Sequence, residues 1–329
     1  MPASGDKSRQ ALFVEQSMEF PLRYISKYKS LKLQTDVAQA SYQKDVLELK
    51  AEARNVYLSW LAGKSKLKSS TENFAIANSF LDKTTQLNAA GQVGRIVLSR
   101  AKITLAQADL ELTKNKNEEL ARRYELLALL GLSTDVTLTA NDSLEALLPL
   151  DISFQNNIDT TKQIDFLLSQ QIVNQNHKEL NYQKWGFAPD LNFRYFKQTE
   201  SNKYYGPAVG ITVPLWAFSQ AGAVKKAKAN YTASRENYQQ TALNINAKWK
   251  SLVVILNQYQ DKMKQYSSLI TDASSISADA KRAYDAGEIG YLEYLDAQQS
   301  YLQSKNLLIE TQLNYLTTLT ELYRLSGNL

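Results

Sequence analysis

The sequence contains no cysteine and only one histidine, His177, among its 329 residues. Without cysteine, the chain has no disulfide framework, no thiolate metal site and no cysteine nucleophile. His177 lies in a polar run, residues 174–178, where a solvated side chain is the simplest interpretation, and no catalytic partner is evident. No phosphate-binding glycine loop follows a strand either. We therefore predict no enzyme activity, no cofactor and no metal site.

Long apolar runs are also missing from the sequence. No segment approaches the ~20 apolar residues that a membrane-spanning helix requires. Residues 1–10 lack the apolar core and cleavage site of a signal peptide. The 38 Lys and Arg residues are mixed with 33 Asp and Glu residues along the chain. This mixture is typical of a solvated surface and argues against a nucleic-acid partner. Contact with a membrane would have to be made by strands.

Proline is rare, with six residues in the chain, and two long stretches contain none. We predict that residues 23–89 and 219–286 are uninterrupted helices, each on the order of 100 Å long at ~1.5 Å per residue. Apolar residues recur every seven positions in the second stretch, as Trp249, Leu256 and Met263 do. A seven-residue repeat is typical of helices that pack as coiled coils.

The second half of the chain repeats the first, with an offset of 196 residues (287 − 91 = 196). Glycine between two helical stretches predicts a left-handed turn that ends one helix and reverses the chain. The sequence therefore indicates two helical hairpins, each with a glycine tip and a second helix that stops at a further glycine. The matching pairs are Gly91 with Gly287, Gly94 with Gly290, and Gly131 with Gly327.

This repeat divides the chain into residues 1–150 and residues 151–329. The first part is predicted as strand, long helix, tip, helix and joint. The second part is predicted as helix, β-hairpin, long helix, tip and helix. Because the second part has a helix and a strand before its proline-ended strand and the first part does not, we expect that one helix and one strand precede residue 1 in a longer gene product.

Three segments alternate between apolar and polar residues, as strands with one apolar face do. They are residues 11–22, 190–196 and 204–216, and the last two are predicted to pair as a hairpin. Aromatic residues gather at or near the strand ends, as in a membrane-interface girdle, although a soluble core would also hold some of them. These residues are Trp185, Phe187, Phe193, Tyr195, Phe196, Tyr204, Tyr205, Trp216 and Phe218.

Several local motifs, in this order and spacing, resemble the TolC family of outer-membrane efflux proteins. The similarity covers essentially the whole chain. It implies a mainly α fold with β: long antiparallel coiled-coil helices that form an α-barrel, plus strands of a trimeric outer-membrane β-barrel. The motifs are Ala90-Gly91, Ala101, residues 129–131, Ala286-Gly287, residues 295–298, Tyr301-Leu302, residues 321–324 and Gly327.

The resemblance also implies a function, a location and partners. It implies a passive duct of a tripartite efflux or secretion system that exports small molecules or metal ions across the periplasm and the outer membrane. The partners would be two further copies of the chain, a periplasmic adaptor, an inner-membrane pump reached indirectly, and outer-membrane lipid. Residues 18–21 resemble the heavy-metal branch. The alternative from a different class is a soluble periplasmic coiled-coil scaffold or adaptor without a pore.

The resemblance implies roles for residues near the two tips. Ala90, Gly91, Ala286 and Gly287 would contact the adaptor. Glu293 and Asp296, three residues apart on one helix face, would line the pore as acidic rings that favour cations, or would be two solvated surface acids.

The family's tip lock is only partly present in this sequence. Tyr284 occupies its lock position, but Ile289 and Val97 stand where the family has a basic and an acidic residue. We hypothesise that Arg100 replaces the lock by pairing with Asp296 or Glu293.

Overall fold

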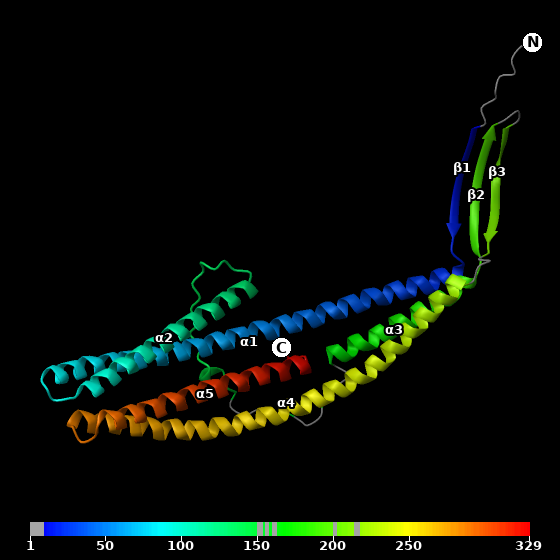
Figure 1. Ribbon diagram of the computed structural model, residues 1–329. Helices are drawn as coiled ribbons and strands as arrows, with labels where there is room; N and C mark the ends of the chain where they lie inside the picture. The colour runs from blue at the N-terminus through cyan, green and yellow to red at the C-terminus, as the bar shows by residue number, and fades with distance from the viewer. Residues whose placement is uncertain (1–9, 150–153, 155–157, 160–162, 200–202, 214–217) are drawn as a thin grey trace, which may run out of the picture. The chain divides into compact units, whose positions relative to one another are not determined.

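The structure is a computed structural model, and it describes residues 10–149, 154, 158–159, 163–199, 203–213 and 218–329. Its elements follow the predicted order, which confirms the fold class of long helical hairpins with a small antiparallel sheet (Figure 1). The elements are β1 (Gln10–Met18), α1 (Pro21–Ala89), α2 (Arg95–Leu129), η1 (Glu145–Leu147), α3 (Ile164–Lys184), η3 (Trp185–Phe187), β2 (Asp190–Thr199), β3 (Lys203–Thr212), α4 (Phe218–Ala286) and α5 (Tyr291–Ser326).

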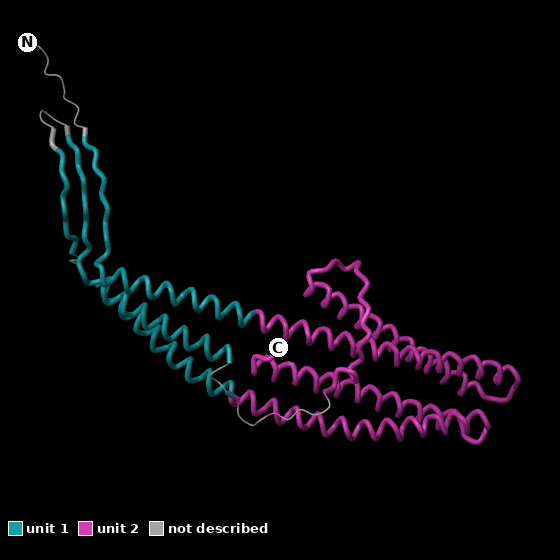
Figure 2. The backbone as a smooth tube through the Cα atoms, turned by 180° about the vertical axis from the view of Figure 1, so that it is seen from behind, with its two compact units in different colours: residues 1–45, 159–245 teal, residues 46–158, 246–329 magenta. Residues whose placement is uncertain are grey.

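The chain forms two compact units, and each unit draws residues from both predicted repeats (Figure 2). Unit 1 comprises residues 1–45 and 159–245, and it contains the sheet and α3. Unit 2 comprises residues 46–158 and 246–329, and it contains α2, α5 and both hairpin tips. The helix lengths match between the halves, with 69 residues in α1 and in α4, and 35 and 36 in α2 and α5. This match supports the duplication, which stays a prediction.

The first strand ends earlier than predicted. The alternation suggested residues 11–22, whereas β1 ends at Met18 and α1 begins at Pro21. Proline suits the first position of a helix because its fixed φ is already helical and its missing N–H has no partner there anyway. Phe20 therefore leaves the strand pattern, and its ring stacks on Trp185 with 6.0 Å between centroids.

The three strands of unit 1 pair antiparallel in the order β1-β2-β3. Their register collects most of the apolar positions of the three strands on one side, whereas Phe13 and Phe196 pair on the other side. Val14 lies opposite Tyr195, for example, and Phe193 lies opposite Val209. Gln16 and Lys197 are the polar exceptions on this face. Its large apolar side chains are exposed, and they include Leu12, Val14, Met18, Phe193, Tyr195, Tyr205, Val209 and Ile211.

The opposite face of the sheet carries the polar pairs. Glu15 faces Arg194 across β1 and β2, and a carboxylate oxygen lies 2.7 Å from a guanidinium nitrogen. The amide of Asn192 donates a hydrogen bond to the hydroxyl of Thr212 on β3. A sheet with one mostly apolar and one mostly polar face suits lipid on one side and water on the other.

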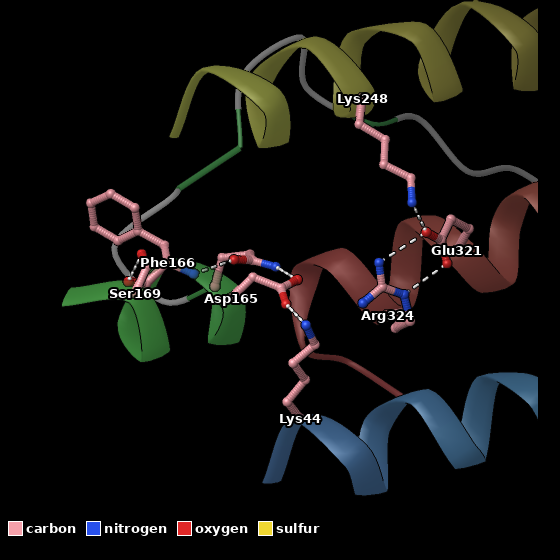
Figure 3. A network of polar contacts seen from close by, with 8 residues as sticks. Lys44, Asp165, Phe166, Ser169, Lys248, Glu321 and Arg324 are labelled. Carbon is pink, nitrogen blue, oxygen red and sulfur yellow. Dashed lines mark hydrogen bonds and ion pairs between the residues drawn. The ribbon is translucent and has the colours of Figure 1, made fainter. Parts of the chain in front are cut away.

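The core of unit 2 includes residues that the seven-residue pattern predicted, together with buried residues of α1 and α5 outside that pattern. Leu256 and Leu316 are at most 1% exposed, and they belong to a cluster that also includes Trp249. Glu321 on α5 accepts two hydrogen bonds from Arg324 and pairs with Lys248 on α4 (Figure 3). Apolar packing and this charged group together hold α4 against α5. Within the described residues, no helix combines the length and hydropathy that crossing a membrane requires.

Candidate functional site

Both hairpin tips have the predicted left-handed glycine. Gly91 has a φ of +74° and Gly287 a φ of +77°. The N–H of Glu288 donates a hydrogen bond of 2.8 Å to the carbonyl of Ala283. The N–H of Gly287 donates one of 3.1 Å to the carbonyl of Tyr284. This is the hydrogen-bond pattern that ends a helix at a left-handed glycine. The four predicted adaptor-contacting residues, Ala90, Gly91, Ala286 and Gly287, are all exposed.

An aromatic cluster holds the second tip to the first hairpin. It joins Phe80 of α1, Tyr284 of α4, and Tyr291 and Tyr294 of α5. The rings of Tyr284 and Tyr294 are stacked with 5.4 Å between centroids, and those of Phe80 and Tyr291 are parallel within 3°. Such aromatic pairs contribute about 0.5–1.5 kcal/mol each beyond the area that they bury. The cluster therefore links the two hairpins within one chain.

The two positions at which the sequence departs from the family's lock lie in this same cluster. Val97 and Ile289 both pack against its rings. One charged contact lies beside the cluster, where Lys83 approaches Asp285 at 3.5 Å and its ammonium lies 4.5 Å from the ring centroid of Tyr284. Apolar packing thus occupies the positions where the resemblance implies a charged lock.

Burial changes the proton affinity of these tyrosines. It raises the pKa of Tyr291 to about 12, and neighbouring Tyr284 and Tyr294 contribute in the same direction. Burial also raises the pKa of Tyr284 and of Tyr294, in both cases with help from the charge of Asp285. The cluster is therefore uncharged at neutral pH.

The predicted gate residues Glu293 and Asp296 lie close to the cluster, and Glu293 also caps a helix. The carboxylate of Glu293 accepts a hydrogen bond of 2.5 Å from the N–H of Gly290, which caps the start of α5. A carboxylate at this point is favoured by the unsatisfied N–H groups and by the helix dipole. Asp296, three residues further along the same helix, is exposed.

Arg100 lies near Glu293 without pairing with it. Both residues line an open groove of about 590 Å³, whose other walls include Ile96, Val97 and Leu292. In the part of the chain that the structure describes, Arg100 makes no ion pair with either Glu293 or Asp296. The replacement of the lock by a pair of Arg100 with Asp296 or Glu293 stays a prediction.

Sequence reasoning missed Phe80, Tyr291 and Tyr294 as partners of Tyr284. A partial signal was present, because Tyr291 and Tyr294 are three residues apart and therefore share one face of the helix that follows the tip. Among the predicted girdle residues, Trp185 is 38% exposed and Phe187 45%. Trp216 lies outside the described residues.

Comparisons of the sequence with known proteins give one family and one curated relative. Residues 165–328 match the family model described as outer membrane efflux protein. The chain is 21% identical over 279 residues to CzcC of Cupriavidus metallidurans, described as a cobalt-zinc-cadmium resistance protein. The match covers 82% of this chain and 65% of CzcC, so the chain spans slightly less than two thirds of that relative.

Comparisons of the fold give close structural neighbours. The CmeC outer membrane channel of Campylobacter jejuni matches with a TM-score of 0.80 at 15% identity, over 98% of this chain and 78% of CmeC. The MtrE outer membrane channel of Neisseria gonorrhoeae matches with a TM-score of 0.81 at 14% identity, over 98% of this chain and 80% of MtrE. At these identities, the likeness establishes the fold.

Proposed function

We propose that this chain is the outer-membrane channel component of a tripartite efflux or secretion system, because residues 165–328 match the outer membrane efflux protein family. The observation that carries the proposal is the sheet of unit 1. Its three strands place exposed apolar side chains on one face and the Glu15–Arg194 ion pair on the other. Copies of such a sheet that close into a barrel satisfy their backbone groups in lipid and enclose a polar passage.

The proposed location is the outer membrane, with the helices extending into the periplasm. The working assembly is a homotrimer, as the strands of one chain are too few to close a barrel alone. The exposed tips at Gly91 and Gly287 are the proposed contact with a periplasmic adaptor, which couples the duct to an inner-membrane pump. The left-handed glycines support this role because a positive φ lets the chain reverse in a tight turn at each tip.

The acidic residues of α5 are proposed to select which ions pass through the duct. Glu293 and Asp296 are both exposed and share a helix face near the tip. Repeated in three copies, they form rings of negative charge that favour cations. The similarity to CzcC supports metal ions as one class of exported substrate, beside small organic molecules.

Cell fractionation tests the proposal against a periplasmic scaffold. The chain is exported behind a secretory signal in a Gram-negative host, and its distribution and cross-linked state are measured. A channel is recovered in the outer membrane, needs detergent for extraction and cross-links as a trimer. Recovery in the periplasmic fraction without detergent would support the scaffold instead. Survival on cobalt, zinc and cadmium salts, with the cognate pump and adaptor present, then tests metal ions as substrates.

A further inference from the structure

An open pocket of about 410 Å³ lies in unit 1, at the end of α3 that leads into β2. It is formed by one face of α3 and one face of α1. Residues three apart project from the same side of a helix, and both contributing sets have this spacing. The lining residues are Ser26 and Lys29 of α1, Lys178, Asn181 and Lys184 of α3, and Trp185 of η3.

The charge of this pocket is entirely positive. Three of its six lining residues are lysines, and no acid lines it. Among the described residues, Lys29, Lys178 and Lys184 form no ion pair. Three ammonium groups that share a pocket repel one another, and an anion bound between them relieves that repulsion.

The acids near the pocket are engaged elsewhere. Glu19 pairs with Lys27 at 2.8 Å, and Asp190 pairs with Arg23 at 3.5 Å. Glu179, on α3 itself, accepts hydrogen bonds from Ser30 at 2.9 Å and from Gln183 at 2.7 Å. The chain therefore neutralises the basic residues around the pocket and leaves the three lysines inside it available.

The position of the pocket beside the sheet favours a lipid headgroup as the bound anion. Lys184 precedes the first residue of β2 by six positions (190 − 184 = 6), so the pocket lies beside the end of the sheet. Trp185 is 38% exposed at its rim and stacks on Phe20, which follows β1. Tryptophan is enriched where protein meets the membrane–water interface, and basic pockets at that level bind anionic lipid headgroups.

We propose that this pocket binds the phosphate headgroup of an anionic phospholipid at the surface of the membrane that holds the sheet. The three ammonium groups contact the phosphate, Ser26 and Asn181 donate hydrogen bonds to it, and Trp185 contacts the start of the acyl chains. The proposal rests on the proposed function, because it requires the sheet to lie in a membrane.

Native mass spectrometry of the full chain in non-ionic detergent tests this site, with phosphatidylglycerol as the probe. The pocket variant carries Lys29→Gln, Lys178→Gln and Lys184→Gln. Its matched control carries Lys225→Gln, Lys226→Gln and Lys228→Gln, which remove the same charge from exposed positions on α4 in the same unit. We expect the pocket variant to bind phosphatidylglycerol at least tenfold more weakly and the control to stay within twofold of the unmodified chain.

Two further probes identify the source of the phosphate. Phosphatidylcholine should bind equally to all three proteins, and inorganic phosphate at the lipid concentration should not displace phosphatidylglycerol. The proposal would be overturned if both variants lost phosphatidylglycerol binding equally or if neither lost it. Displacement of phosphatidylglycerol by inorganic phosphate would also overturn it. Circular dichroism checks that the variants are folded. Because the measurement needs no pore, absent lipid binding in a chain that still fractionates with the outer membrane refutes this site and leaves the proposed channel intact.

Discussion

The ring of Tyr284, at the end of α4, stacks on the ring of Tyr294 in the first turns of α5, with 5.4 Å between centroids and planes within 7°. The stack spans the second hairpin tip, and through Tyr291 it continues to Phe80 of the first hairpin. Moving the second tip away from the first hairpin would therefore separate aromatic surfaces as well as the pair of Lys83 with Asp285.

Replacing Tyr294 tests how much this stack stabilises the tip. Tyr294 is 7% exposed, so Tyr294→Ala removes a buried ring and should lower the free energy of unfolding by about 2–4 kcal/mol. Tyr294→Phe keeps the ring and should lower it by less than about 1 kcal/mol. Urea denaturation measures both values. Equal losses for the two variants would show that the hydroxyl, and not the stack, is what matters.

Valine at Gly287 tests the left-handed tip. With φ at +77°, a β-branched side chain is strained although no atom lies within 4 Å of the added Cβ. Gly287→Val should therefore lower stability by roughly 1–2 kcal/mol and impair export. Gly94→Ala is the matched control, because Gly94 has a φ of −78° and equally open surroundings. The tip assignment fails if export with Gly287→Val equals that of the control.

Alkaline unfolding tests the burial of Tyr291. Its pKa in the folded chain is about 12, above the ordinary value of 10, so the unfolded chain ionises first as pH rises. The stability that this residue contributes is complete below pH 10 and is lost between pH 10 and about 12. Tyr291→Phe cannot ionise, so its stability should fall less steeply over this range. Denaturant midpoints at several pH values measure the stability of both proteins. If stability falls equally steeply with pH in the native chain and in Tyr291→Phe, the prediction is contradicted.

Acid unfolding tests the group around Glu321 in the same way. Burial alone would raise the pKa of this carboxyl, but hydrogen bonds from Arg324 and Lys248 outweigh it and lower the pKa below 4.5. Its stabilisation is therefore present above pH 4.5 and is lost as pH falls through the lower folded pKa. The stability difference between the native chain and Glu321→Gln should shrink in acid. The control is Glu310→Gln, which breaks only the exposed pair with Lys66. It should lower the free energy of unfolding by about 0.5 kcal/mol.

Much of the architecture could be predicted because it follows from local chemistry. The glycines at 91, 131, 287 and 327 were placed at helix ends from the repeat alone, and all four have positive φ. The two 69-residue helices followed from the absence of proline, and the sheet faces from the alternation of mostly apolar with mostly polar residues. These features depend on residues close together in the sequence, where spacing fixes geometry.

The aromatic cluster could not be predicted in the same way. Phe80 meets Tyr291 from a position 211 residues earlier in the chain (291 − 80 = 211), and a single sequence carries no record of that contact. The task of Glu293 was also missed, because its spacing from Asp296 drew attention to the pore and not to the free N–H of Gly290. Long-range packing decided the first of these, whereas the second is a local cap between residues three apart.

The most direct test of the proposed channel compares two neighbouring residues of β3, and it benefits from a chain without cysteine. Val209 lies on the apolar face of the sheet and Ala208 on the polar face, and both are exposed. Single variants Val209→Cys and Ala208→Cys are labelled in outer membranes with a charged, water-soluble maleimide. We predict that Ala208→Cys reacts at least tenfold faster, because in the proposed channel lipid covers Val209. Equal rates at the two positions would contradict it.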